Sequence, residues 1–388
     1  MTLNKPTRAQ LSSINLGIAI TLWLVAGLFR SIPTLGEIAT LTLASFFSLL
    51  AVWSKVELRG KNLLLISISI ALFVYTFAFS PFLGRSLVQA FYFFVAALIF
   101  ICFTTAQKQD SAQISVTYKV FLFFGTLHAL ALIALYLEKP IRVTGLMEDY
   151  SQASLLILFA FALNYARLKT SSYFSAICLV LFLGFFTTFS RTANALLALF
   201  LFSLFWFEWR HGRIGHIVKT VTIVLLSLVS VYLYPKLINL ATINRGGLSQ
   251  FNTLNSRTIY WESAWNAIKE KPIVGHGLGN FEWTGIKEAR PFKVIHHVHN
   301  DYLQIWHDLG IFWLAVLLLT LAWLLLRNIP VQTIFGKKLS TSHISEEGYI
   351  SWVLLCCLAL YMSINFALYS IPLQAGILLC LLRIQYAR

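Results

Sequence analysis

The stretch that decides the fold is residues 302–326, which read YLQIWHDLGIFWLAVLLLTLAWLLL. A predominantly apolar run of this length is long enough to cross the hydrocarbon core of a bilayer as an α-helix. Comparable runs recur along the chain, so the protein is predicted to cross the membrane many times. With this run included, twelve spans are predicted, at residues 12–29, 35–53, 63–80, 86–104, 117–136, 152–168, 171–189, 192–208, 217–235, 302–326, 349–368 and 371–386.

The amino-acid composition points to the same class of protein. Hydrophobic residues make up 58% of the chain and charged residues only 12%, whereas a soluble protein carries about 25% charged residues. Backbone groups must bond to one another inside lipid, which favours helices, and the runs are continuous rather than alternating, which argues against a transmembrane barrel. We therefore predict an all-α fold. It is a polytopic membrane helical bundle of about twelve transmembrane helices, a single domain over residues 1–388 with one large outer loop.

Two further features fit a chain that stays in the membrane. The five cysteines all lie inside predicted spans, so they imply no disulfide framework and are interpreted as small packing residues. The first apolar run has spanning length and no small-residue cleavage site. It is therefore interpreted as a retained helix rather than a removed signal peptide.

Lysine and arginine are distributed unevenly between the two sides of this arrangement. Five lie in the short connections on one side: Arg30, Arg85, Lys139, Arg142 and Arg191. Seventeen lie at the two termini and in the connections on the same side as the termini: Lys5, Arg8, Lys55, Arg59, Lys61, Lys108, Lys119, Arg167, Lys169, Arg210, Arg213, Lys219, Arg327, Lys337, Lys338, Arg383 and Arg388. Positive residues accumulate on the cytoplasmic side, so both termini are predicted to be cytoplasmic. Much of the net charge of +15 is therefore topological, and it requires no nucleic-acid partner.

The remaining eight basic residues lie in one long connection, residues 236–300, which this topology places on the outer face. Connections longer than about 15 residues are usually functional or disordered. Within it, residues 255–268 are predicted to form an amphipathic helix, capped by Asn255 or Ser256 and followed by Pro272. One face of that helix carries apolar residues at helical spacing: Trp261, Ala264, Trp265 and Ile268. Such a face suits a helix that lies in the membrane interface or packs on the bundle.

Arg257 is expected at the N-terminus of this amphipathic helix. There the unpaired N–H groups and the helix dipole favour an anion, and a guanidinium adds two parallel donors. Arg257 is therefore a candidate anion-binding residue, and the alternative is an ordinary surface arginine.

A glycine-rich stretch, Gly275-His276-Gly277-Leu278-Gly279-Asn280, follows the helix. It superficially resembles a phosphate-binding loop, but it lacks Gly-Lys-Ser/Thr, follows no buried strand and lies on the side without ATP. A tight turn that needs the backbone freedom of glycine is the preferred interpretation.

Arg191 and Arg142 are two further arginines on the predicted outer side. Arg191 lies between two consecutive spans in Thr187-Thr188-Phe189-Ser190-Arg191-Thr192, with polar neighbours on both sides. An inward-facing anion site is favoured over an arginine that reaches out to lipid headgroups. Arg142 lies in a short loop on the same face and is a weaker candidate for the same role.

Four of the nine histidines lie between residues 296 and 307: His296, His297, His299 and His307. A metal site is conceivable, but the spacing matches no zinc pattern and no cysteine or HExxH accompanies it. Structural histidines are a second alternative. A general base is preferred, because an imidazole titrates near neutral pH and needs little tuning for that task. His299 is the favoured residue, because a helix beginning near Asn300 would hold it at the mouth of the helix. Asp301 or Asp308 could orient its ring.

The segment His299-Asn300-Asp301-Tyr302-Leu303-Gln304-Ile305-Trp306-His307-Asp308-Leu309-Gly310 resembles the signature of the O-antigen ligase family and of its relatives, the O-antigen polymerases and the bacterial O-oligosaccharyltransferases. That signature is similar to His-Asn/Ser-x-x-Leu-x-x-x-x-acid-x-Gly. Asp308 stands where the family more often has glutamate. The segments around Arg191, Arg257 and Pro272 to Gly277 are also similar to the family, and the specific resemblance covers about residues 185–315.

The resemblance implies a metal-independent glycosyltransferase without a cofactor, which takes a glycan from undecaprenyl diphosphate on the periplasmic face of the bacterial inner membrane. In an O-antigen ligase the acceptor is a hydroxyl of lipid A-core. On this basis His299 is the expected general base, and Arg142, Arg191 and Arg257 are expected to bind the donor diphosphate. His297, Asn300 and Asp308 are expected to support the site.

Three alternatives use the same kind of lipid-linked substrate. An O-antigen polymerase or a protein O-oligosaccharyltransferase would use the same donor with another acceptor. From a different class, a lipid-linked sugar flippase or secondary transporter would also have about twelve helices. Transporters usually place polar groups near the bilayer midplane. Here the polar groups gather on one face, which favours an interfacial enzyme.

Overall fold

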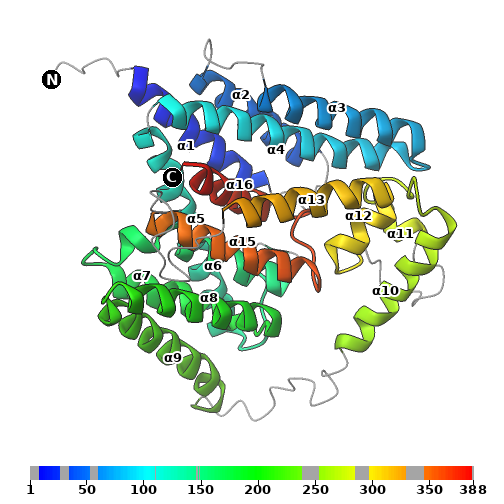
Figure 1. Ribbon diagram of the computed structural model, residues 1–388. Coiled ribbons are helices and arrows are strands. Elements are labelled where there is room, and N and C mark those ends of the chain that lie inside the picture. The colour runs from blue at the N-terminus through cyan, green and yellow to red at the C-terminus, as the bar shows by residue number, and fades with distance from the viewer. Residues whose placement is uncertain are drawn as a thin grey trace. The chain divides into compact units, whose positions relative to one another are not determined.

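The computed structural model describes residues 8–26, 35–52, 60–109, 111–145, 147, 149–237, 253–284, 297–328 and 345–386 (Figure 1). The regular elements in these ranges are all helices, and no strand occurs among them. The all-helical part of the predicted fold class is therefore confirmed. His296, Leu146 and Glu148 lie outside the described residues, as do residues 238–252.

The helices follow one another along the chain as α1 (Arg8–Ala26), α2 (Leu35–Val52), α3 (Lys61–Phe79), α4 (Leu83–Gln109), α5 (Ser111–Glu138), α6 (Tyr150–Leu168), α7 (Phe174–Thr187), α8 (Arg191–Arg210), α9 (Ile214–Leu237), α10 (Thr253–Glu270), α11 (Phe281–Thr284), α12 (Asp301–Leu309), α13 (Ile311–Arg327), α15 (Glu346–Met362) and α16 (Ile371–Tyr386).

Six helices in the described part of the chain are long and apolar enough to cross a membrane: Asn62–Phe79, Leu83–Ala106, Ser115–Glu138, Tyr150–Leu168, Arg191–Arg210 and Ile214–Tyr234. Five shorter apolar helices accompany them: Leu11–Ala26, Ile38–Val52, Phe174–Thr187, Ile311–Arg327 and Ile371–Ile384. The chain is thus a multi-pass membrane protein. The count of twelve spans and the orientation of the termini stay predictions. All five cysteines lie in helices and are unpaired.

The chain divides into two compact units. Unit 1 comprises residues 1–117, 248–324 and 359–374, and unit 2 comprises residues 118–247, 325–358 and 375–388. In unit 1, α1 packs against α2, α3 runs beside α4, and α10 and α11 lie against α12 (Figure 1).

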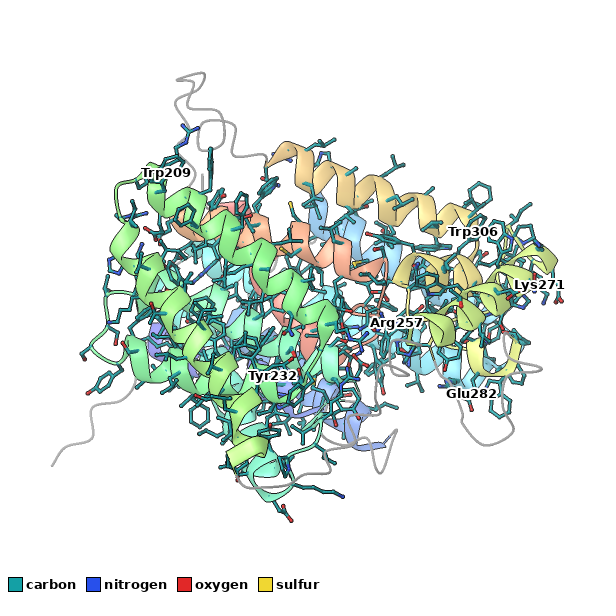
Figure 2. The ribbon with its side chains drawn as sticks, turned by 90° about the horizontal axis from the view of Figure 1, so that it is seen from below. Trp209, Tyr232, Arg257, Lys271, Glu282 and Trp306 are labelled. Carbon is teal, nitrogen blue, oxygen red and sulfur yellow. The ribbon has the colours of Figure 1, made fainter. Side chains whose placement is uncertain are left out.

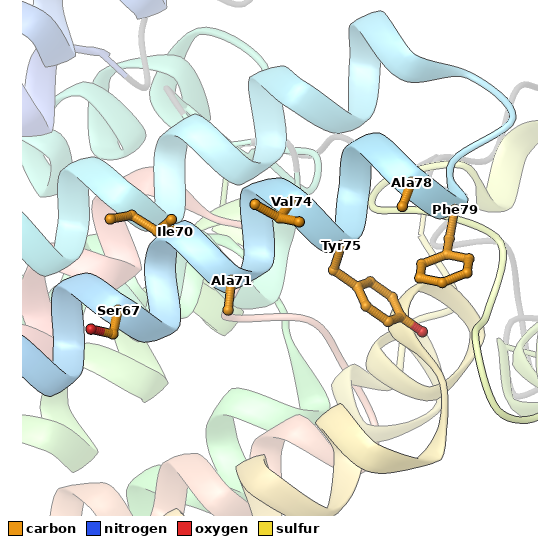
Figure 3. Close-up of a pocket in the computed structure, with 7 residues that line it drawn as sticks. All are labelled: Ser67, Ile70, Ala71, Val74, Tyr75, Ala78 and Phe79. Carbon is orange, nitrogen blue, oxygen red and sulfur yellow. The ribbon is translucent and has the colours of Figure 1, made fainter.

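An open apolar groove runs along α3 in unit 1. Its lining residues are Ser67, Ile70, Ala71, Val74, Tyr75, Ala78 and Phe79 (Figure 3). Near the end of α3, the Tyr75 hydroxyl donates to the Val274 carbonyl at 2.8 Å and the Tyr75 ring meets Trp313 edge-on. The residues that line the groove include no cluster of charged side chains, so the groove is not a candidate for the catalytic site.

Unit 2 is built around α6, whose side chains are almost all buried. A Cβ on Gly184 of α7 would lie 2.6 Å from Ala129 Cα, so only glycine allows α5 and α7 to approach this closely.

The buried Glu208 carboxylate is paired with Lys169 at 3.0 Å and with Arg213 at 2.9 Å. Buried charges are tolerated when they are paired in this way, because each partner offsets the loss of hydration of the other.

The predicted continuous span over residues 302–326 is wrong, because two helices meet at Gly310. Gly310 has φ +82°, a backbone conformation that side-chain-bearing residues rarely adopt. Its N–H still bonds to the Trp306 carbonyl, while the next N–H, that of Ile311, bonds to the Pro272 carbonyl. The chain therefore leaves α12 and starts α13 in a new direction. An apolar sequence pattern does not reveal such a break.

Gly310→Ala is expected to destabilise unit 1 by about 2 kcal/mol or more, because alanine would have to adopt a positive φ. The added Cβ would also lie 1.8 Å from the Ile273 carbonyl oxygen, so the backbone must shift. Thermal unfolding of the purified protein in detergent measures the effect. Gly84→Ala in α4 is the matched control, because a Cβ there meets open space. Equal melting temperatures for the two variants would contradict this account.

The predicted span over residues 349–368 is also too long. Helix α15 ends at Met362, and residues 363–370 form a connection before α16. This connection carries the buried polar side chains of Asn365 and Ser370, the first of which lies inside the predicted span. The connection lies against the start of α12, where Asn300 bonds to the Ser363 carbonyl.

Candidate functional site

Helix α12 begins at a well-formed cap. The Asn300 side-chain oxygen accepts a hydrogen bond from the Leu303 N–H at 3.0 Å, which satisfies one of the free donors at the helix start. The Asn300 amide nitrogen donates to the Ser363 carbonyl at 2.8 Å and so ties the cap to the 363–370 connection. Asn300 therefore has a structural role that follows directly from its contacts.

His299 precedes this cap and has φ +57°, which is unusual for a residue with a side chain. Such strain persists only where the surrounding structure holds it, and it concentrates at functional sites. Here the imidazole is held by aromatic rings. It stacks on the Tyr260 ring with centroids 5.8 Å apart and meets the Phe366 ring edge-on at 5.1 Å. The Trp261 indole N–H donates to the His299 carbonyl at 3.4 Å.

A polar partner of the His299 ring is Asn365, in the 363–370 connection. The two side chains meet at 3.2 Å between His299 Nδ1 and Asn365 Oδ1, and Asn365 is fully buried. Neither carboxylate suggested by the sequence fills this position. Asp308 bonds to His307, and Asp301 bonds to backbone groups of the connection. The suggestion that Asp301 or Asp308 orients the ring gains no support from these contacts, and the side chain that meets His299 Nδ1 is Asn365.

Asp301 holds the connection that carries Asn365. Its Oδ2 accepts from the N–H groups of Ala367 at 2.7 Å and Leu368 at 3.2 Å, and its side chain is fully buried. Burial raises the pKa of the Asp301 carboxyl to about 7, and the two backbone hydrogen bonds oppose that rise. Asp301 thus fixes the position of the residues that surround His299.

Asp308 is the centre of a second buried network. Its two carboxylate oxygens accept from the Gln304 amide at 3.0 and 3.1 Å, from His307 Nδ1 at 2.7 Å, from the Gly279 N–H at 2.8 Å and from the Tyr369 hydroxyl at 2.7 Å. Burial and the nearby Asp308 charge raise the pKa of Tyr369 well above its usual value, so its hydroxyl keeps the proton that it donates. These contacts make Asp308 a structural residue that joins three segments of unit 1.

The glycine-rich stretch wraps around the end of α12, as a tight turn should. Gly275, Gly277 and Gly279 all have positive φ, which confirms the predicted turn. The N–H groups of His276 and Gly277 bond to the carbonyls of His307 and Asp308, both at 2.8 Å. His276 stacks on His307, and burial lowers the pKa of His276. The backbone N–H groups of His276 and Gly277 are therefore used to bind the last carbonyls of α12.

Arg257 lies on α10, which begins at Thr253. Asn255 and Ser256 therefore lie within the bounds of α10, and their side chains, with the predicted capping role, lie outside the described residues. Arg257 precedes Tyr260 by three residues and so lies one turn from it on the same face. Tyr260 stacks on His299, so the face of α10 that Arg257 shares with Tyr260 is the face that contacts the His299 ring. Figure 2 labels Arg257 near one end of α10 and Lys271 beyond the other.

The buried face of α10 differs slightly from the predicted face. Ala264 and Ile268 are buried as expected, together with Ala267, and Trp261 packs on Val298 and Phe281. Trp265 is 43% exposed, and its ring meets Trp306 edge-on at 5.4 Å. Trp265 therefore marks the edge of the face rather than its centre.

Two other histidines of the cluster have separate environments. The His297 ring stacks on Phe366 at 4.3 Å and lies beside Tyr369 at 5.5 Å. His307 is fully buried and contacts the Thr284 hydroxyl at 2.8 Å as well as Asp308. The described residues contain no group of three or more histidine, cysteine, aspartate or glutamate side chains arranged to hold a metal ion.

Arg142 and Arg191 both belong to unit 2, where Arg142 bonds to the chain three residues before Arg191. The Arg142 guanidinium donates to the Thr188 carbonyl at 2.9 Å and lies 3.8 Å over the Tyr150 ring. Arg191 is the first residue of α8, its side chain is exposed, and Ser190 caps that helix through the Ala193 N–H. This corner suits an anion, because helix N-termini and guanidinium groups both favour negative charge.

The starts of α6 and α8 lie close together in this corner. Asp149 caps α6 by accepting from the Ser151 N–H at 2.7 Å. The Ser154 hydroxyl, in the first turns of α6, contacts the Thr188 hydroxyl, two residues before the Ser190 cap, at 2.5 Å. Two helix N-termini and two arginines therefore gather at one end of unit 2.

Asn365 and Tyr260 are the residues of the candidate site that sequence reasoning missed. Asn365 lay inside a predicted span, where no motif or periodicity marks it, and only the end of α15 at Met362 places it in a connection. Tyr260 belongs to the predicted amphipathic helix, and its spacing from Arg257 was the one available signal.

Comparison with known families bears on this site. A family model described as O-antigen ligase matches residues 174–318, which include α10, His299 and all of α12. The resemblance to this family is therefore confirmed over that part of the chain. The match implies a membrane glycosyltransferase of the O-antigen ligase or polymerase type, acting on a lipid-linked glycan and a membrane-embedded acceptor. Searches of curated proteins and of solved structures found no match.

Proposed function

We propose that this protein is an O-antigen ligase. It transfers a glycan from undecaprenyl diphosphate to a hydroxyl of lipid A-core, on the periplasmic face of the bacterial inner membrane, with both termini in the cytoplasm. The observation that carries the proposal is the strained His299, whose ring is held between Tyr260 and Phe366. Tyr260 itself lies one helical turn from Arg257 on α10. A titratable imidazole and a guanidinium are the two kinds of group that an attack by a hydroxyl on a donor with a diphosphate leaving group needs.

The reaction needs one proton acceptor and one site for developing negative charge. His299 takes the proton from the acceptor hydroxyl as its oxygen bonds to the anomeric carbon. The bond between that carbon and the diphosphate breaks, and its electron pair leaves with undecaprenyl diphosphate. Arg257 stabilises the charge on the leaving group, a task that fixed guanidiniums perform without a divalent cation. The diphosphate bond supplies the energy, so neither ATP nor a cofactor is required.

Arg142 and Arg191 are further donor-binding residues in this proposal. Their support is the anion-favouring corner of unit 2, where the starts of α6 and α8 lie close to both arginines. His297, Asn300 and Asp308 support the site through structure. Asn300 and Asp308 do so by the hydrogen bonds described above, and His297 does so by packing on Phe366.

Arg257→Lys is expected to raise the KM for the lipid-linked donor about tenfold, although it keeps the positive charge. Lysine cannot form the two parallel hydrogen bonds that a guanidinium makes to a diphosphate. Steady-state kinetics with purified protein measures this effect. Lys269→Arg, at the exposed far end of the same helix, is the matched control and should leave KM unchanged. An unaltered KM in Arg257→Lys would remove Arg257 from the donor site.

Deleting the gene in its host and examining the surface polysaccharide tests the choice of acceptor. A ligase deletion leaves lipopolysaccharide without a polysaccharide cap and accumulates long undecaprenyl-linked polymer. Cores that carry a single repeat would indicate a polymerase. An intact polysaccharide ladder with an unglycosylated protein would indicate an O-oligosaccharyltransferase, and failure to deliver the donor across the membrane would indicate a flippase.

A further inference from the structure

The orientation of the Asn365 side-chain amide is fixed by a neighbouring backbone group. The Phe366 N–H lies 3.0 Å from Asn365 Oδ1 and donates to it. If the amide were turned over, its NH₂ group would face the Phe366 N–H, and two donors would meet with no acceptor between them. The oxygen of Asn365 therefore occupies the position at which the His299 ring makes contact. This assignment rests on the hydrogen-bond network, which is the proper basis for placing amide oxygen and nitrogen atoms.

An acceptor at this position determines which ring nitrogen of His299 carries the proton. The contact joins His299 Nδ1 to Asn365 Oδ1 at 3.2 Å. An amide oxygen can only accept, so Nδ1 must be the donor and must carry the hydrogen in the neutral ring. A neutral imidazole has one proton, so Nε2 then holds the lone pair. We propose that Asn365 is a positioning residue that fixes His299 in the Nδ1–H tautomer and makes Nε2 the nitrogen that accepts the proton of the acceptor hydroxyl.

The surroundings of Asn365 are built to hold this geometry. Asn365 itself is fully buried, and the next residues of its connection, Ala367 and Leu368, are bound through their N–H groups by Asp301. The Asn300 amide grips the same connection at Ser363. The ring of His299 is meanwhile limited by the stack on Tyr260 and the edge contact with Phe366. Both partners of the contact are thus held by further contacts, as a precise orientation requires.

The inference rests on the proposed function for its catalytic meaning, but the tautomer can be measured without any reaction. Nitrogen NMR of histidine-labelled protein in lipid bilayers distinguishes a protonated from an unprotonated ring nitrogen, and the His299 signals are assigned by their loss in His299→Asn. At a pH at which the His299 imidazole is neutral, we expect the wild-type ring to be protonated at Nδ1 and unprotonated at Nε2. In Asn365→Leu, which has similar size and no acceptor, that preference should be lost. A wild-type His299 protonated at Nε2 would overturn the proposal.

Kinetics of two Asn365 variants supply the second test. Asn365→Leu is expected to lower kcat about 10²-fold with little change in KM, because a misoriented base affects the chemical step. Asn365→Asp keeps an acceptor, so activity should be retained. Its carboxylate would also stabilise the charged imidazole and move the acid limb of the pH–rate profile to higher pH.

Ser363→Ala, in the same connection, is the matched control and should behave as wild type, because Asn300 bonds to its backbone carbonyl. Full activity in Asn365→Leu, or an Asn365→Asp profile identical to that of the wild type, would contradict the assignment. If the wild-type protein shows the expected tautomer but transfers no glycan, the proposed function is refuted, whereas the assignment of the His299 tautomer still holds.

Discussion

His299→Ala is expected to lower glycan transfer by about 10²–10⁴-fold, which is the usual contribution of a positioned general base. The fall should appear in kcat, because His299 acts on the reacting hydroxyl rather than on binding. Transfer of a labelled glycan by the purified protein measures the loss.

Two further variants separate catalysis from folding. His299→Asn removes the base but tolerates a positive φ better than alanine does, so it should fold normally and be equally inactive. His216→Ala, a histidine in α9 of unit 2, is the matched control and should retain activity. If either His299 variant, correctly folded, transferred glycan at the wild-type rate, His299 would not be the base.

Asp308→Ala is expected to destabilise the protein by about 3–5 kcal/mol, the usual effect of removing one member of a buried charged network. The loss leaves donors from Gln304, His307, Gly279 and Tyr369 without their acceptor inside the protein. Thermal unfolding in detergent measures the change. Asp308→Asn, which keeps one oxygen of the same shape, should lose less.

The matched control for Asp308 is Glu262→Ala, which removes an exposed carboxylate from α10 and should change stability by less than about 0.5 kcal/mol. Activity in Asp308→Ala should fall only as far as the folded fraction falls. An Asp308→Ala protein with wild-type stability and no activity would instead indicate a direct part in the reaction.

Much of the fold could be predicted because a chain that crosses lipid must satisfy its backbone hydrogen bonds internally. Apolar runs of spanning length must be helical, so the helices themselves were predictable from hydropathy alone. The breaks were not. Gly310 looks like any small residue in an apolar run, and its positive φ is set by the approach of the Ile273 carbonyl, which belongs to a distant segment.

The candidate site was predictable only where local sequence carried the signal. His299 and Arg257 stand in short motifs, so they could be singled out directly. Asn365 is 66 residues from His299 in the chain, and the sequence around Asn365 does not predict its contact with His299. The role of Asp308 depends on the Gly279 N–H and the Tyr369 hydroxyl, which only the folded chain brings to it. Partners joined by tertiary packing leave no periodicity in a single sequence.

The central claim is that this protein joins a lipid-linked glycan to a membrane acceptor by a reaction that needs neither ATP nor a metal. The most direct measurement places the purified protein in liposomes with an undecaprenyl-diphosphate-linked glycan and lipid A-core, in the presence of EDTA. We expect glycan to appear on lipid A-core while undecaprenyl diphosphate is released in equal amount, and we expect His299→Ala to lower both by about 10²–10⁴-fold. A donor that crosses the bilayer unchanged, or transfer that requires a divalent cation, would contradict the claim.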